Sequence, residues 1–263
     1  LQNDPELRAK YQFWGYSYSS GNPVIYSSKQ FRDALDSMHK SILDSGKSDQ
    51  KFNEMVLICH SMGGLIATPL VTDSDKETLC NQISPYFINF FKDAPAEEIE
   101  DVTPYIVFAH RPYIKRVIFI AVPHRGSDMA LGMIAMLGIS LIDLPQTVIE
   151  QQSPLMKYIH PNQQSRLRNG IENLEPDNFT IIALNKLKIQ VPYHSIIGND
   201  EEANMPGGTD GIVPYWSSHL DGAQSELVVK SGHSAQQNPL AIQDVRRILK
   251  LHLQEIEQAK PAK

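Results

Sequence analysis

The chain has little cysteine, no cluster of positive charge and none of the short motifs that bind metals. It contains two cysteines among 263 residues, too few for a framework of disulfides. Its net charge is −6 and its basic residues are dispersed, whereas nucleic acids are bound by a basic patch or stripe. No Cys-x-x-Cys, no His-Glu-x-x-His and no acidic loop with calcium-binding spacing occurs. We therefore expect no disulfide scaffold, no nucleic-acid partner and no metal.

The sequence shows no signal-peptide pattern, although one would lie upstream in a longer polypeptide. It also has no run of apolar residues long enough to cross a bilayer, which takes about 20 residues. The apolar stretch 129–142 is too short for that. It is expected either to be buried between layers or to form a cap wall of an apolar substrate pocket, with Met133 and Met136 adapting to apolar chains of different length. Since 41% of the residues are hydrophobic, the chain can bury one full core, and a single domain over 1–263 is expected.

Patterns typical of strands and helices alternate along the chain. Strands are expected at 12–18, 55–58, 115–121, 192–197 and 225–229, and helices at 28–43, 63–71 and 239–256. This alternation predicts an α/β fold with a mainly parallel sheet and helices on both faces. Two segments, at about 73–112 and 128–190, are longer than a crossover needs. We expect them to be helical cap insertions.

A serine follows one of these strands at the start of a helix, in the run Cys59-His60-Ser61-Met62-Gly63-Gly64. This arrangement is typical of a nucleophile elbow, a sharp turn whose neighbours two positions from the serine must be small. Gly63 meets that demand, whereas Cys59 stands where the pattern G-x-S-x-G has glycine. Ser61 is therefore the candidate nucleophile, and the Met62 N–H is a candidate donor to an oxyanion. An ordinary Ser-Gly turn in a doubly wound protein is the alternative.

A serine nucleophile needs a histidine base and a carboxylate that orients the histidine, in the chain order serine, acid, histidine. Asp210 and His233 both follow predicted strands, at the sheet edge where α/β proteins place their chemistry. Asp200 competes for the role of acid, and either carboxylate could instead cap turn amides. His124 is the competing base, although chain order favours His233. We expect His60 to pack against or polarise the turn and to border the substrate pocket.

Three parts of the sequence carry a family resemblance: the motif around Ser61, the segment 119–127 and the block 209–233. Together they resemble the bacterial serine esterases and lipases of the α/β-hydrolase superfamily. The resemblance implies the α/β-hydrolase fold, a triad of Ser61, Asp210 and His233, no cofactor and a small-molecule ester or lipid substrate. It favours Asp210 because that aspartate precedes an Ile-Val pair, as the acid does in small bacterial lipases. It further implies export or lipid anchoring in the bacterial envelope, with a cytoplasmic location as the alternative.

The sequence departs from this family in its supply of oxyanion donors. The family takes the second donor from a His-Gly loop after a strand that lies between the 12–18 strand and the strand before Ser61, and no such segment precedes Tyr11. We therefore expect the chain to be the downstream part of a longer polypeptide whose upstream segment it needs. A local rearrangement near Gly15 or at 123–127 is the alternative source of the donor.

These features predict a serine carboxylic ester hydrolase that works through an acyl-enzyme. The missing donor and Cys59 also motivate a second hypothesis, a non-catalytic chain that binds an acyl ligand or a partner. Acyl transfer to an alcohol in place of water would use the same triad.

Overall fold

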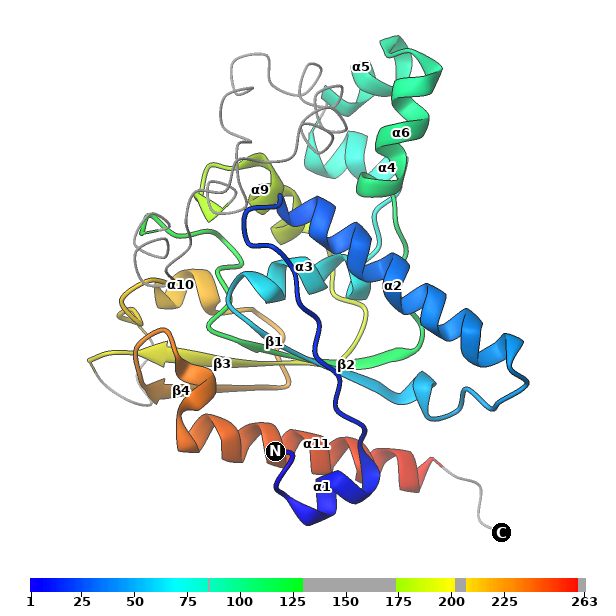
Figure 1. Cartoon of the computed structure of the whole chain (residues 1–263). Coiled ribbons are helices and arrows are strands. Elements are labelled where there is room, and N and C mark those ends of the chain that lie inside the picture. The colour runs from blue at the N-terminus through cyan, green and yellow to red at the C-terminus, as the bar shows by residue number, and fades with distance from the viewer. Residues whose placement is uncertain (85, 130–173, 202–206, 260–263) are drawn as a thin grey trace.

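The chain folds around a central sheet covered by helices on both faces (Figure 1). The structure is a computed structural model that describes residues 1–84, 86–129, 174–201 and 207–259. Within these residues the sheet contains four strands in the order β1 (Met55–His60), β2 (Ile114–Ile120), β3 (Tyr193–Asn199) and β4 (Ser225–Lys230). Every neighbouring pair is parallel. The predicted parallel α/β architecture is therefore confirmed.

The two inner strands are buried along most of their length, as is usual where helices cover both faces of a parallel sheet. In β2 only Lys115 is exposed, and the side chains from Arg116 to Ile120 are buried. Because parallel strands point the same way, their carboxyl ends meet at one edge of the sheet. The chain segments that follow β1, β3 and β4 start from this edge.

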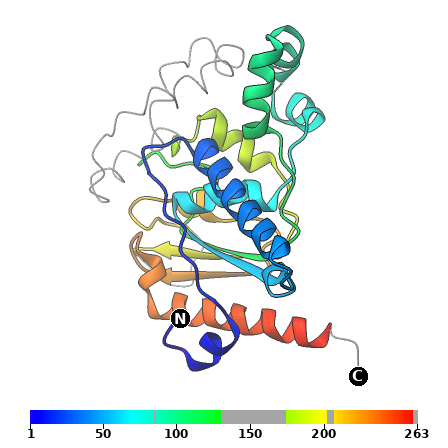
Figure 2. The same ribbon diagram turned by 45° about the vertical axis from the view of Figure 1, so that its right-hand side comes forward.

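Helices α2 (Val24–Asp44) and α3 (Met62–Val71) cover one face of the sheet, and α9 (Phe179–Lys186) packs on α3 (Figure 2). The short helix α1 (Pro5–Lys10) and the long helix α11 (Pro239–Gln258) cover the opposite face. On that face Leu7, Val245 and Ile248 pack with apolar side chains of the inner strands. Burial of each such side chain contributes about 1.5–3 kcal/mol to the free energy of folding.

A separate group of helices lies beyond α2 and α9, at the end of the molecule opposite α11 (Figure 1). It consists of α4 (Lys76–Thr78), the π-helical turn η2 (Leu79–Ile83), α5 (Tyr86–Asp93) and α6 (Ala96–Ile106). These helices share an apolar cluster with α9, centred on Phe87 and Phe90. They occupy the first of the two segments expected to be insertions. Most of the second, 128–190, lies outside the described residues.

The predicted strand at 12–18 is wrong, because this segment is extended but pairs with no strand in the described part of the chain. It links α1 on one face to α2 on the other, and so crosses the sheet beside β1 (Figure 1). Phe13 packs with the apolar cluster of the α11 face, whereas Tyr16 and Tyr18 pack with the cluster of the α3 face. A strand must run along its neighbour, and this segment runs across it. In the described residues β1 is therefore an edge strand, with Ile58 39% exposed.

Most other predicted boundaries are close to those observed, and the largest difference is at the start of α2. This helix begins at Val24, earlier than the predicted residue 28, because Pro23 precedes it and Val24 is fully buried. The remaining short elements are η1 (Phe52–Glu54), α10 (Tyr215–Ser218) and η5 (Ala235–Gln237). Of the helices in the described ranges, none has both the length and the apolar character that a membrane span requires.

Candidate active site

Ser61 lies in a tight turn between β1 and α3. Its backbone has φ 53° and ψ −135°, a region that residues other than glycine rarely adopt and that costs on the order of 1–3 kcal/mol. The turn is held by the Ser61 N–H, which donates to the carbonyl of Ile120, and by the Gly64 N–H, which donates to the Ser61 carbonyl. The surroundings thus maintain an unfavourable backbone conformation at this one serine, as the elbow motif predicts.

Small residues around the turn let α3 approach β2 closely. A Cβ at Gly64 would lie 2.3 Å from a methyl carbon of Val122, far too close for two carbons. Cys59, on the other side of the serine, is buried in the core of the α3 face. Burial raises the pKa of its thiol to about 12, so the sulfur stays protonated at neutral pH. Cys59 and Cys80 are both free thiols.

His233 follows β4 and lies beside the serine. Its Nε2 is 2.8 Å from the Ser61 hydroxyl oxygen, and its Nδ1 is 2.8 Å from a carboxylate oxygen of Asp210. All three residues are buried, with 3% of His233, 3% of Asp210 and 7% of Ser61 exposed. A neutral ring with its proton on Nδ1 donates to the carboxylate and can accept the serine proton at Nε2. The structure therefore brings together the three residues singled out by the sequence, joined by two hydrogen bonds.

Asp210 is held in the loop after β3 by its own neighbours. One carboxylate oxygen faces His233, and the other accepts hydrogen bonds from the N–H groups of Ile212 at 2.9 Å and Val213 at 2.6 Å. A Cβ at Gly198, near the end of β3, would lie 2.8 Å from the Cβ of Asp210. The competing carboxylate, Asp200, is exposed. The aspartate that precedes the Ile-Val pair is thus the one that contacts the histidine.

His60, the residue before Ser61, contacts the main chain of His233. Its Nε2–H donates to the His233 carbonyl at 2.8 Å, and the two ring centroids are 5.0 Å apart. Burial lowers the pKa of His60, so its ring is neutral at neutral pH. The contact anchors the loop that carries His233 to the end of β1. The sequence predicted packing at the turn for His60, but no motif identifies its partner.

His124, the competing base, is buried against Phe119 and has no carboxylate partner among the described residues. The two rings meet edge to face at 4.7 Å, and Nε2 of His124 has no hydrogen bond. Burial, assisted by the charge of Arg125, lowers the pKa of His124 to about 3. A ring that binds no proton until about pH 3, without an orienting acid, is unsuited to be the base.

We expect His124 to make folding stability fall as the pH falls below 6.5. The folded chain keeps this ring neutral, whereas the unfolded chain protonates it at its ordinary pKa of 6.5, so stability is complete above that pH and is lost toward the folded pKa of about 3. At pH 5 the loss is roughly 2 kcal/mol. The measurement is the free energy of urea unfolding at pH 7 and pH 5, for the wild type and for His124→Asn.

The free energy of unfolding should change between pH 7 and pH 5 by roughly 2 kcal/mol less in the variant than in the wild type, because asparagine does not titrate. This readout is independent of any overall destabilisation that the substitution causes. The same pH dependence in both proteins would show that His124 is not the residue that titrates.

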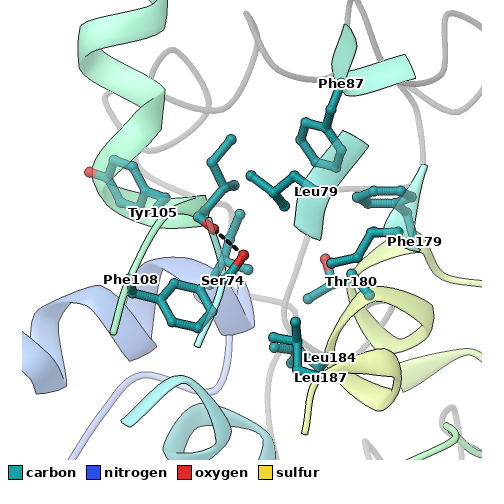
Figure 3. A pocket seen from close by; sticks show the side chains of 13 residues that line it. Ser74, Leu79, Phe87, Tyr105, Phe108, Phe179, Thr180, Leu184 and Leu187 are labelled. Carbon is teal, nitrogen blue, oxygen red and sulfur yellow. Dashed lines mark hydrogen bonds between the residues drawn. The ribbon is translucent and has the colours of Figure 1, made fainter. Parts of the chain in front are cut away.

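An apolar pocket opens between α9 and the separate group of helices formed by α4, η2, α5 and α6 (Figure 3). Aromatic and aliphatic side chains from η2, α5, the end of α6 and α9 line it, among them Leu79, Phe87, Tyr105, Phe108, Phe179 and Leu184. The hydroxyl of Ser74, one of its few polar groups, donates to the Ile106 carbonyl. Leu184 and Leu187 also border a smaller pocket lined by Leu65 and Thr68 of α3. Two hollows therefore meet at α9. The larger is apolar, and the smaller, which His124 and Asn185 also line, reaches the helix that begins after Ser61.

The residues that the sequence predicted for the substrate pocket either lie away from these two pockets or are outside the described residues. Met133 and Met136 lie outside the described residues, and His60 lines neither of these two pockets. Several lining aromatic residues come from the segment 73–112, where the sequence shows only aromatic side chains among acidic ones. Across the described ranges, no group of three His, Cys, Asp or Glu side chains is arranged to hold a metal ion.

Searches against known proteins give similarities in structure only. No family model matches the sequence, and no curated protein matches it. The mature form of Bacillus licheniformis lipase BlEst2 is 13% identical, with a TM-score of 0.44 over 87% of this chain and 75% of that one. EstA from Clostridium botulinum is 17% identical, with a TM-score of 0.40 over 69% of this chain and 60% of that one. Staphylococcus hyicus lipase is 13% identical, with a TM-score of 0.40 over 79% and 71%.

The chain's own geometry defines its architecture. A parallel sheet, a sharp turn at Ser61 after β1, an aspartate after β3 and a histidine after β4 are arranged as in α/β-hydrolases. The chain thus has an α/β-hydrolase-like fold.

Proposed function

We propose that this chain is a serine carboxylic ester hydrolase that works through an acyl-enzyme. The observation that carries the proposal is the buried hydrogen-bond chain from Ser61 through His233 to Asp210, with both links at 2.8 Å. A serine hydroxyl at neutral pH is a poor nucleophile unless a base takes its proton, and this chain supplies the base and the acid that orients it.

In the acylation step, Nε2 of His233 takes the hydroxyl proton while the oxygen of Ser61 bonds to the ester carbonyl carbon. The carbonyl oxygen gains a negative charge, toward which the Met62 N–H at the start of α3 can donate. When the carbon–oxygen bond to the alcohol breaks, His233 returns the proton to the departing alkoxide. Ser61 is then left as its ester, and Asp210 stabilises the charged ring while it exists.

In the second step, water replaces the alcohol. His233 takes a proton from water, the hydroxide oxygen bonds to the acyl carbon, and the bond to Ser61 breaks as its oxygen regains a proton. A carboxylic acid and free enzyme result. Acyl transfer would follow the same steps with a second alcohol in place of water, so the products of an assay in the presence of alcohol distinguish the two reactions.

The test is covalent labelling combined with an ester assay. A fluorophosphonate probe should label the chain, and peptide mapping should place the label on Ser61. A panel of p-nitrophenyl esters should be hydrolysed by the same preparation. Labelling at another residue would refute the nucleophile, and a folded chain with neither labelling nor hydrolysis would support non-catalytic ligand binding in its place.

The acyl chain of the substrate is assigned to the apolar pocket of Figure 3. Apolar concave sites with few polar groups favour alkyl chains. The smaller pocket supports this assignment because it connects the larger pocket to α3. It shares Leu184 and Leu187 with the larger pocket, and its α3 residues, Leu65 and Thr68, lie one to two helical turns from the start of that helix. Short acyl groups would not reach the larger pocket, whereas long chains would fill it.

Filling this pocket is expected to impair long substrates selectively. Ala183 of α9 lines the pocket, so Ala183→Phe should lower kcat/KM for a laurate ester about 10-fold or more relative to acetate. The control is Ile182→Phe, because Ile182 is 40% exposed on the same helix and does not line the pocket. Equal losses on laurate and acetate in Ala183→Phe would place the acyl chain elsewhere.

A further inference from the structure

Among the described residues, the candidate active site has one evident backbone donor for an oxyanion, the Met62 N–H, and a second donor must come from another group. The sequence suggested residues 123–127 as a source, but the N–H groups of residues 124–127 are already engaged. Two of them donate to Ser217, one to the carbonyl of Pro123 and one to the carbonyl of Leu174. Pro123 has no N–H. Residues 123–127 therefore offer no free backbone N–H that could act together with the Met62 N–H.

A side-chain hydroxyl lies close to the start of α3. The phenol oxygen of Tyr18 is 3.4 Å from the position that a Cβ would occupy at Gly63, the second residue of the helix. Because Gly63 has no side chain, this residue does not fill the space between the Tyr18 hydroxyl and the first amides of α3. Tyr18 comes from the segment that crosses the sheet beside β1, so tertiary folding alone brings it here.

The ring of Tyr18 is held in place by aromatic packing. It stacks on Tyr16 with ring centroids 6.0 Å apart, and Tyr16 stacks on Phe31 of α2 at 4.1 Å. The Tyr16 hydroxyl donates to the carbonyl of Ser27, which fixes that ring to the start of α2. A donor held by such packing needs little reorganisation when charge develops near it.

The Tyr18 hydroxyl is also free to donate. No hydrogen bond among the described residues uses it. Burial raises the pKa of Tyr18 to about 12, and neighbouring Cys59 and Tyr16 add to the effect. The phenol therefore remains protonated at neutral pH, with its O–H available to an acceptor.

We propose that the Tyr18 hydroxyl is the second donor to the oxyanion, opposite the Met62 N–H. The inference rests on the proposed ester hydrolysis at Ser61. Tyr18 then hydrogen-bonds the carbonyl oxygen as that oxygen becomes negative, and it transfers no proton. Its contribution is greatest in the transition state, so its loss should lower kcat and leave KM nearly unchanged.

The test is Tyr18→Phe, which keeps the ring and its stacking and removes one oxygen atom. We expect kcat on a p-nitrophenyl ester to fall about 10²- to 10³-fold, with KM within about threefold of the wild type. The inhibition constant of a trifluoromethyl ketone, which forms a serine-bound oxyanion, should rise in the same variant. The comparison is Tyr16→Phe, which removes the hydroxyl that anchors the same aromatic stack and so measures how much kcat is lost when only the stack is weakened. This loss should be much smaller than that of Tyr18→Phe.

The possible outcomes separate this inference from the proposed function. If the wild type hydrolyses esters and Tyr18→Phe matches it in kcat and inhibitor affinity, Tyr18 is not the donor. If Tyr16→Phe and Tyr18→Phe lose kcat equally and unfold at lower urea concentrations, the role of the stack is structural and the inference is wrong. A wild type that neither hydrolyses esters nor is labelled at Ser61 refutes the ester hydrolase itself, and Tyr18 as its donor with it.

Discussion

Replacing Ser61 with alanine is expected to lower kcat for ester hydrolysis by on the order of 10⁴- to 10⁶-fold. The substitution removes the oxygen that bonds to the acyl carbon, so no acyl-enzyme can form, although His233 and Asp210 remain in contact. The residual rate should come from substrate binding and oxyanion stabilisation alone. Steady-state hydrolysis of p-nitrophenyl esters measures the loss, and fluorophosphonate labelling should disappear in parallel.

The matched control is Ser37→Ala, because Ser37 is an exposed serine on α2. Its kcat should equal that of the wild type. Ser61→Ala should fold like the wild type, because alanine is smaller than serine and the cost of the positive φ is similar for both residues. Ester hydrolysis that survives in Ser61→Ala at the wild-type rate would mean that another group performs the reaction.

Replacing Asp210 with asparagine is expected to lower kcat by about 10⁴-fold. One side-chain oxygen of Asp210 accepts from the N–H groups of Ile212 and Val213, so an asparagine would keep its carbonyl oxygen there and turn its NH₂ toward His233. The ring nitrogen Nδ1 would then have to accept, which moves the ring proton to Nε2. In that tautomer His233 cannot take the proton of Ser61.

Asp200→Asn is the control for this prediction, because Asp200 is the competing carboxylate of the same loop and is exposed. Its kcat should stay within about twofold of the wild type, as is usual for exposed positions away from the chemistry. Wild-type activity in Asp210→Asn together with a large loss in Asp200→Asn would reverse the assignment of the acid.

Local patterns were sufficient to predict most of the sheet and the elbow. The strands of the sheet and the helices α3 and α11 begin and end close to the predicted residues, because apolar periodicity and turn residues act between near neighbours in the chain. The turn at Ser61 was recognisable for the same reason, since the demand for small residues falls on adjacent positions. Residue spacing alone left Asp200 and Asp210 both open, and the resemblance to bacterial lipases favoured the residue that contacts His233.

The segment 12–18 shows where local patterns fail. Its alternating aromatic residues are compatible with a strand that has two buried faces. They are equally compatible with a crossing segment whose side chains enter two different cores. Only the positions of α1 and α2 on opposite faces of the sheet decide between these possibilities. The same crossing brings Tyr18 to Gly63, a contact that no periodicity in the sequence indicates.

The sequence by itself thus determined the parallel α/β architecture and the identity of the serine at the elbow. Only the tertiary structure shows that Asp210 contacts His233, that His60 holds the main chain of His233, and that Tyr18 lies beside α3. The physical reason is the range of the interactions involved. Backbone conformation and amphipathic periodicity depend on residues close together in the chain, whereas hydrogen-bond partners at a sheet edge are fixed only when strands distant in sequence pack against one another.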